Sequence, residues 1–123
     1  MASISRFEDI QAWQKARVLV FDVYEITNSG LFARDFGLRD QIRRASVSSM
    51  TNIVEGYSRM SNRDFARFLD IASSSASEVR SLLYVALDQK YIAPETFQKL
   101  YDNAYEVGAM IFGFSNYLRN NLK

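Results

Sequence analysis

The spacing of the apolar residues is the feature that most constrains what this chain can fold into. Over residues 61–89 they recur at intervals of three and four, which places them on one face of a helix. That face consists of Phe65, Phe68, Leu69, Ala72, Ala76, Val79, Leu83 and Ala86. A similar stripe in residues 9–28 consists of Ile10, Trp13, Ala16, Val20, Val23 and Tyr24. No segment alternates with the period of two that a strand requires, so the sequence predicts an all-α protein.

Three breaks, marked by most of the glycines and the single proline, divide the chain into four helical segments. The predicted helices are residues 9–28, 37–57, 61–89 and 94–120, with residues 29–36 as a loop. Short connections favour antiparallel packing of successive helices. We therefore expect residues 1–123 to form one domain, an antiparallel up-down-up-down four-helix bundle. A dimer that exchanges helical hairpins is the alternative architecture.

Residues suited to helix starts support these boundaries. Asp9 is a candidate N-cap for the first helix. Ser61 and Asp64 resemble a capping box, in which the serine accepts from an early amide and the acid reaches back. Pro94 suits the first turn of the last helix, where its missing N–H carries no cost.

The composition removes several classes of chemistry. The chain has no cysteine and no histidine, which excludes disulfides, thiol nucleophiles, Ser-His-Asp catalysis and imidazole or thiolate metal sites. We therefore expect a protein that is not an enzyme, with no catalytic residue, metal or cofactor. The missing cysteines, the lack of a signal peptide and the lack of a long apolar run indicate a cytoplasmic protein that does not enter membranes. The net charge of +1 argues against a generally basic surface.

A polar stripe lies beside the apolar face of residues 37–57. It consists of Gln41, Arg44, Ser48, Asn52 and Glu55, spaced three or four apart, and Ser74, Ser75 and Glu78 form a matching row on the next helix. One interpretation is a satisfied polar network that fixes helix register or subunit contacts, because unpaired buried polar groups are costly. The other makes Glu55 and Glu78 a carboxylate pair for acid–base catalysis or a hard metal such as magnesium. We favour the network, since no nucleophile or phosphate loop accompanies the two acids.

A set of arginines provides candidate contacts to nucleic acid. Arg59, Arg63 and Arg67 recur every four residues, and Arg39, Arg43 and Arg44 lie on the preceding helix. The candidate contacts are Arg43, Arg59, Arg63 and Arg67. Such clusters suit phosphate groups. Acidic residues are interleaved with them, so a solvated, salt-bridged helix face is the alternative.

Apolar residues also occur outside the predicted core faces. They are Val18 and Phe21 in the first helix and Tyr105, Phe112 and Tyr117 in the last. Aromatic residues beyond the core are typical of interfaces, so we expect a homo-oligomer; a loosely packed monomer surface is the alternative.

Three elements of the sequence occur together in one known family. They are Phe7-Glu8-Asp9-Ile10 with Trp13-Gln14-Lys15-Ala16; Leu38 with Gln41-Ile42-Arg43-Arg44-Ala45, Ser48 and Asn52-Ile53-Val54-Glu55-Gly56-Tyr57; and Phe68-Leu69, Ile71-Ala72, Ser75 and Glu78. Through them, nearly the whole chain resembles the 23S rRNA intervening-sequence proteins, also called four-helix bundle proteins. The departures are Ser74 where the family usually has glycine, Ser49 and Met50 in place of an apolar residue and a proline, and Leu31 in place of a loop proline.

The resemblance implies a bundle that assembles as a homo-oligomer, typically a pentameric ring. Genes of the family lie in insertions within large-subunit ribosomal RNA genes of some bacteria, and no enzymatic activity is established for it. Similar bundles serve diversity-generating retroelements, where they bind a reverse transcriptase and nucleic acid. The leading hypothesis is therefore a non-enzymatic oligomeric binding or scaffold protein whose candidate partners are RNA, DNA or a protein that handles them. The alternatives are a purely structural protein–protein interaction module and a metal-dependent hydrolase that uses Glu55 and Glu78.

Overall fold

Helices account for nearly all of residues 4–122, the part of the chain that the computed structural model describes. They are the short 3-10 helix η1 (Phe7–Asp9) and the α-helices α1 (Gln11–Ile26), α2 (Gly30–Arg34), α3 (Phe36–Tyr57), α4 (Asn62–Asp88) and α5 (Pro94–Arg119). No strand occurs among these residues. The protein is therefore all-α, as its apolar spacing predicts, and none of its described helices is long and apolar enough to cross a membrane.

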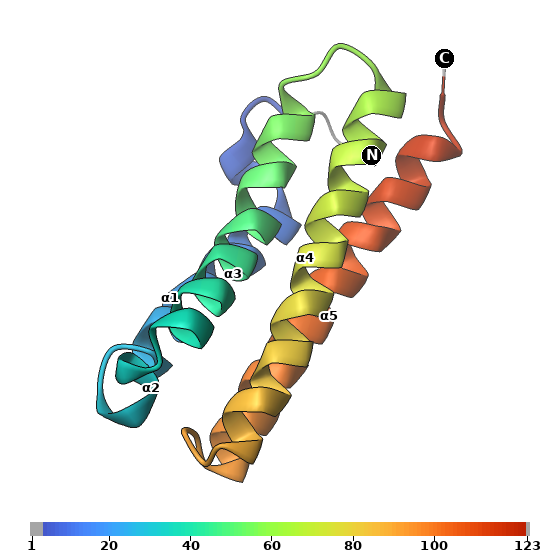
Figure 1. The fold of residues 1–123 in the computed structure, drawn as a ribbon. Coiled ribbons are helices and arrows are strands. Elements are labelled where there is room, and N and C mark those ends of the chain that lie inside the picture. Colours follow the sequence, from blue (N-terminus) through green and yellow to red (C-terminus); the bar gives the residue numbers. More distant parts are fainter. Residues whose placement is uncertain (1–3, 123) are drawn as a thin grey trace.

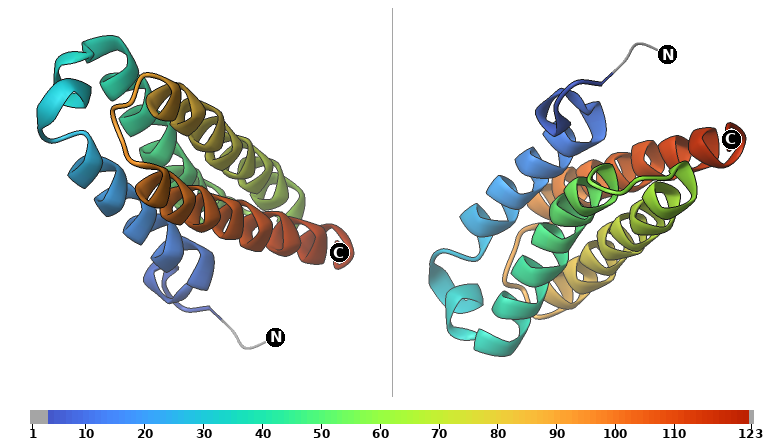
Figure 2. Two further views of the ribbon diagram at one scale, coloured as in Figure 1. Left: turned by 90° about the horizontal axis from the view of Figure 1, so that it is seen from below. Right: turned by 90° about the horizontal axis from the view of Figure 1, so that it is seen from above.

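The four long helices pack side by side as a helical bundle (Figure 1). Helix α4 packs on α3 and α5, and α1 packs on the same two helices. At one end, the hydroxyl of Tyr57, the last residue of α3, donates to the carbonyl of Ile4 at 3.1 Å. At the same end, Asn62 at the start of α4 donates to the carbonyl of Asn121, at 3.1 Å. Views of the bundle from below and from above show the same arrangement (Figure 2).

The opposite end is held by contacts between two connections. Phe32 of α2 packs against Tyr91, which lies between α4 and α5, with ring centroids 5.4 Å apart. The Tyr91 hydroxyl donates to Asp35, at 3.0 Å. Asp35 also caps α3, because its other carboxylate oxygen accepts from the amide of Leu38. One carboxylate therefore starts a helix and ties together both connections at this end.

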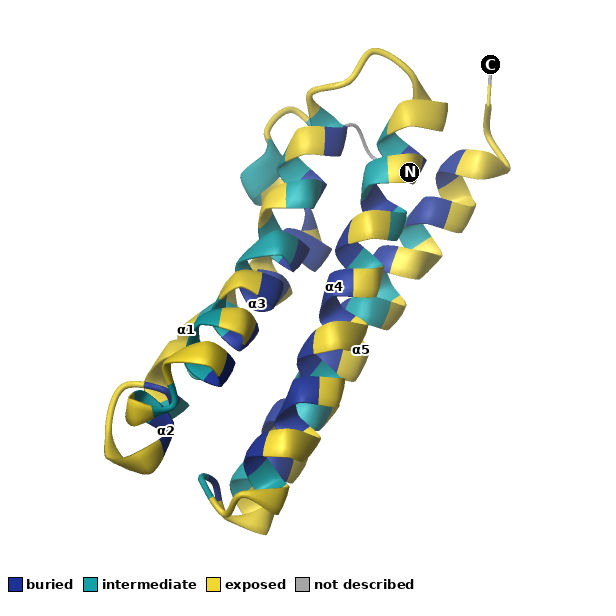
Figure 3. Ribbon diagram, viewed as in Figure 1, coloured by how far each residue is buried: buried dark blue, intermediate teal, exposed yellow. Residues whose placement is uncertain are grey.

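The core runs the length of the bundle, along the inner faces of the four long helices (Figure 3). Its largest fully buried aliphatic side chains are Leu19, Ile42, Ile53, Leu69, Leu83 and Ile111. Burial of each such side chain contributes roughly 1.5–3 kcal/mol. Helix α1 departs from the predicted stripe: Leu19 is fully buried, whereas Tyr24 is exposed and lies toward α3.

The helix boundaries correct several predictions. Asp9 does not cap α1, because residues 7–9 form η1 and Ile10 occupies the N-cap position. Residues 29–36 are not only a loop, since they contain α2. Ser61 does cap α4, where its hydroxyl accepts from the amide of Asp64 at 3.1 Å. The Asp64 carboxylate pairs with Arg67 at 3.9 Å.

Candidate functional site

Part of the predicted polar stripe lies at the seam between α3 and α4. The hydroxyls of Ser48 and Ser75 share a hydrogen bond of 2.8 Å across the seam. Asn52 donates to the hydroxyl of Ser48 at 2.9 Å and to its carbonyl at 3.0 Å. Further along, Gln41 donates to Glu78 at 3.3 Å. Two bonds therefore link the helices, Ser48 to Ser75 and Gln41 to Glu78, and Asn52 supports Ser48 from within α3.

Glu55 and Glu78 are not brought together. Glu78 lies opposite Gln41, and Glu55 follows fourteen residues later on α3, about 21 Å further along the axis at the usual helical rise. Glu55 pairs instead with Arg59, at 3.2 Å. The described residues contain no cluster of three or more acids that could hold a metal ion. The geometry therefore does not assemble the carboxylate pair that the hydrolase alternative requires.

The four predicted nucleic-acid contacts fall into two groups. Arg59 and Arg67 lie near the connection between α3 and α4, each with its guanidinium 4.6 Å from the centroid of the Phe68 ring. Arg63 is exposed between them in sequence and has no hydrogen bond or ion pair within residues 4–122. Arg43 lies sixteen residues before Arg59, roughly 24 Å along the helix.

Arg43 is held in place by the end of α1. Its Nε donates to the Thr27 hydroxyl at 2.8 Å, and its Nη2 donates to the Thr27 carbonyl at 3.3 Å. The guanidinium also lies 4.4 Å from the centroid of the Tyr24 ring. Thr27 is fully buried, so these bonds satisfy polar groups that water cannot reach. Arg43 therefore joins α1 to α3 as well as presenting a charge.

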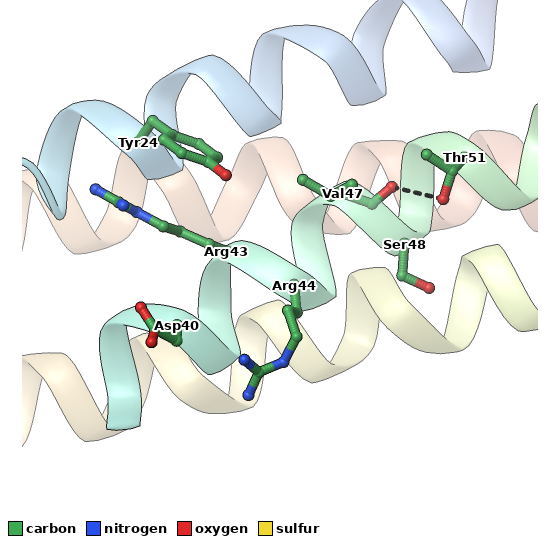
Figure 4. Close-up of a pocket in the computed structure, with 7 residues that line it drawn as sticks. All are labelled: Tyr24, Asp40, Arg43, Arg44, Val47, Ser48 and Thr51. Atoms are coloured by element: carbon green, nitrogen blue, oxygen red, sulfur yellow. Dashed lines mark hydrogen bonds between the residues drawn. The ribbon is translucent and has the colours of Figure 1, made fainter. Parts of the chain in front are cut away.

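A shallow groove of about 630 Å³ follows the outer face of α3 beside Tyr24 (Figure 4). Its lining residues are Tyr24, Asp40, Arg43, Arg44, Val47, Ser48 and Thr51. Arg43 extends toward α1, and Arg44 extends toward α4. Arg44 is exposed, and within the described residues it forms no ion pair with Glu55 or Glu78. It is therefore not part of the polar seam that the sequence predicts for it.

Asp40, the acid in this groove, is already paired. Arg39 donates to its carboxylate at 2.9 Å. This bond is the main cause that holds the pKa of Asp40 below its usual value. Desolvation is the next largest effect and opposes it, while the charges of Arg39, Arg44 and Arg43 assist the bond. Asp40 therefore stays ionised near neutral pH, with its charge compensated by arginines.

One polar network, between α4 and α5, is not predicted from the sequence. The buried hydroxyl of Ser115 donates to Asp70 at 2.7 Å, and Arg119 donates to the same carboxylate. The bond from Arg119 is the largest cause that lowers the pKa of Asp70, with burial opposing it and Ser115 assisting. Asp70 and Arg119 lie 49 positions apart, so no local spacing could have linked them.

Large apolar side chains are exposed on two different faces. On α1, Val18 and Phe21 are 53% and 63% exposed and line a shallow depression with Trp13, Gln14 and Arg17. On α5, Tyr105 is 59% exposed and lies beside Arg80 of α4, 5.3 Å from its guanidinium. Its sequence neighbour Glu106 pairs with Lys15 of α1. Tyr105 therefore faces the α4 side of the bundle, away from the α1 depression.

Comparison with known proteins agrees with this architecture. The crystal structure of a protein of unknown function from the S23 ribosomal protein family, from Bacteroides thetaiotaomicron, superposes with a TM-score of 0.75. The two sequences are 23% identical over 83% of this chain and 95% of that one, so the likeness concerns the fold. A search of curated proteins finds no significant match. The family model described as 23S rRNA-intervening sequence protein matches residues 8–113. The chain therefore belongs to the 23S rRNA-intervening sequence protein family.

Proposed function

We propose that this protein is a non-enzymatic binding or scaffold module of the cytoplasm that engages nucleic acid as a homo-oligomer. The observation that carries the proposal is the placement of arginines on aromatic rings at two sites of a nearly neutral molecule: Arg59 and Arg67 on Phe68, and Arg43 on Tyr24. Cationic and aromatic groups together are the elements of sequence-tolerant binding to single strands.

The two exposed apolar faces support assembly. A head-to-tail ring needs two different adhesive surfaces on each subunit. The α1 face contains Val18 and Phe21, and the α5 face contains Tyr105 and Phe112. We propose that up-down-up-down bundles join through these faces into a pentameric ring. Five copies of a weakly basic surface would then bind one nucleic-acid chain by avidity.

The experiment is a salt titration of nucleic-acid binding, read by fluorescence anisotropy with labelled single-stranded RNA and DNA. We expect binding at low salt, with the logarithm of the binding constant falling linearly as the logarithm of the salt concentration rises, because phosphate contacts release counterions. Arg63→Gln should lower the slope, since Arg63 has no carboxylate partner within residues 4–122. Arg34→Gln, a change of the same kind on α2, is the control. The absence of binding even at low salt would refute the proposal.

A second candidate is an interaction module for another protein, without nucleic acid. It is favoured by the aromatic rings of Tyr84, Phe97 and Tyr101, which contact one another between α4 and α5. Arg80 lies 5.5 Å from the Tyr101 ring and 5.3 Å from the Tyr105 ring. Tyrosine and arginine are enriched at protein interfaces. A stable oligomer that binds neither RNA nor DNA at any salt concentration would favour this candidate.

A further inference from the structure

We infer that the groove along α3 binds a single-stranded segment of nucleic acid, with phosphates at Arg43 and Arg44 and a base against Tyr24. The inference rests on the proposed function and names the site and the ligand form. Apart from Tyr24 of α1, the lining residues form two adjacent rows on α3: Asp40, Arg44 and Ser48 on one side, and Arg43, Val47 and Thr51 on the other. From residue 40 to residue 51 the groove extends about 16 Å along the helix.

The first element is a cation that is fixed before any ligand binds. Two bonds to Thr27 and the ring of Tyr24 hold the guanidinium of Arg43. These bonds use Nε and one hydrogen of Nη2, and Nη1 has no partner among the described residues. An arginine has five N–H donors in a rigid fork, so donors remain for a phosphate. A fixed fork loses little side-chain entropy on binding.

The second element is a cation with no competing partner. Arg44 is exposed and extends from the other side of α3, and it forms no hydrogen bond or ion pair within residues 4–122 (Figure 4). The nearby acid, Asp40, is engaged by Arg39 at 2.9 Å. Arg44 therefore keeps its charge available to a ligand, while Arg39 compensates the acid that would repel a phosphate.

The third element is the apolar surface beside Arg43, made by Tyr24 of α1 and Val47 of α3. Val47 and the exposed ring of Tyr24 lie along the groove, with the hydroxyls of Ser48 and Thr51 at one end (Figure 4). Bases of a single strand are free to stack on aromatic rings and guanidinium planes, whereas the bases of a duplex are covered. The combination of stacking surface and cations favours single strands over both duplexes and acidic peptides, which use the charges alone.

The experiment measures binding of the intact protein to a labelled 12-nucleotide single-stranded RNA, to the duplex of the same sequence and to a 12-residue glutamate peptide. We expect tighter binding of the single strand. Arg44→Gln should weaken it and reduce the salt slope by about one for each contacting subunit. Tyr24→Leu keeps an apolar side chain but removes the ring, and should weaken single-strand binding by about fivefold or more without affecting the salt slope.

Two controls match these variants. Arg34→Gln removes an arginine outside the groove, and Phe36→Leu removes an exposed ring that also carries a stacked arginine, Arg39 at 4.9 Å. Unchanged helical circular dichroism verifies that every variant folds. Wild-type binding that neither Arg44→Gln nor Tyr24→Leu weakens, or that the controls weaken equally, would refute the groove while leaving the proposed function intact. Equal binding of the duplex or of the peptide would refute the single-strand assignment. No binding of any nucleic acid would refute both proposals.

Discussion

Arginines with similar sequence surroundings take different roles in this protein, and their partners decide which. Arg43 and Arg44 are consecutive, yet Arg43 is bonded to Thr27 of the α1 end, whereas Arg44 extends free on the α4 side. Arg119 closes a network with Asp70 and Ser115. The role of each cation therefore depends on residues distant in sequence, which charge patterning alone does not identify.

The Asp70 network predicts a pH dependence of stability. Because Arg119 lowers the folded-state pKa of Asp70, the carboxylate contributes stability above its unfolded pKa, and this contribution is lost as the pH falls through the folded value. Asp70→Asn should lower the free energy of unfolding by less than about 1 kcal/mol at pH 7, since the side chain is 42% exposed. Urea unfolding at pH 7 and pH 2.5 measures this. A difference in the free energy of unfolding between Asp70→Asn and wild type that persists unchanged at pH 2.5 would contradict this prediction. Asp102→Asn is the control.

Lys90 predicts a stabilising change. It follows α4 with a φ of +61°, in the left-handed region, and the amide of Tyr91 closes the helix end by donating to the carbonyl of Ala86 at 2.9 Å. A side chain costs energy there and glycine does not, so Lys90→Gly should raise the free energy of unfolding by about 1 kcal/mol. Lys99→Gly, inside α5, should lower it by about the same amount. Thermal unfolding measures the change in stability of each variant. Changes of the same sign in the two variants would contradict the assignment of Lys90 to a strained backbone conformation.

At the scale of helices, α3 and α4 approach closely at one glycine. A Cβ on Gly56 would lie 2.8 Å from Cδ1 of Phe65 and 3.0 Å from both the Phe65 carbonyl oxygen and Cβ of Phe68. The serine pair and Asn52 line the same seam with short polar side chains. Small groups at this seam let the two helices pack closely. The hydrogen bonds across it fix the position of one helix along the other.

The close approach predicts opposite effects for two glycine substitutions. Gly56→Ala should lower the free energy of unfolding by about 1–3 kcal/mol, because backbone and ring atoms must shift. Gly113→Ala, on α5, meets no atom within 4 Å and should raise it by up to about 1 kcal/mol through helix propensity. Denaturant unfolding measures both. A neutral or stabilising Gly56→Ala would show that the seam is looser than the structure indicates.

At the scale of the whole molecule, the bundle buries a complete core yet exposes large apolar side chains on two faces. The apolar inner faces of all four long helices are buried in this core. Phe21 on α1 and Phe112 on α5 remain 63% and 54% exposed. Exposed aromatic residues on two different faces are what a repeating assembly needs, because each subunit must present two complementary surfaces.

The two faces predict a specific result for mixed variants. Phe21→Asp and Phe112→Asp should each lower the mass in solution, since a buried charge at an interface is costly. If the contacts are head-to-tail, each variant retains one intact face, so an equal mixture should form pairs and no larger ring. Light scattering measures the masses, and Met60→Asp, on a fully exposed side chain near the end of the bundle, is the control. Unchanged mass in both single variants would refute the assembly proposal.

The sequence by itself determined the four long helices, most of the inward-facing residues and the Ser61 cap, because helical periodicity and capping are local properties. It also located the serine and asparagine stripe at a helix seam, since that stripe lies beside an apolar face. The sequence could not predict three long-range hydrogen-bonded pairs, because their partners meet only when separate segments pack. They are Tyr91 with Asp35, Arg119 with Asp70, and Arg43 with Thr27. Tertiary packing likewise separated Glu55 from Glu78 and left Arg44 free, and these placements decide which surface is available to a ligand.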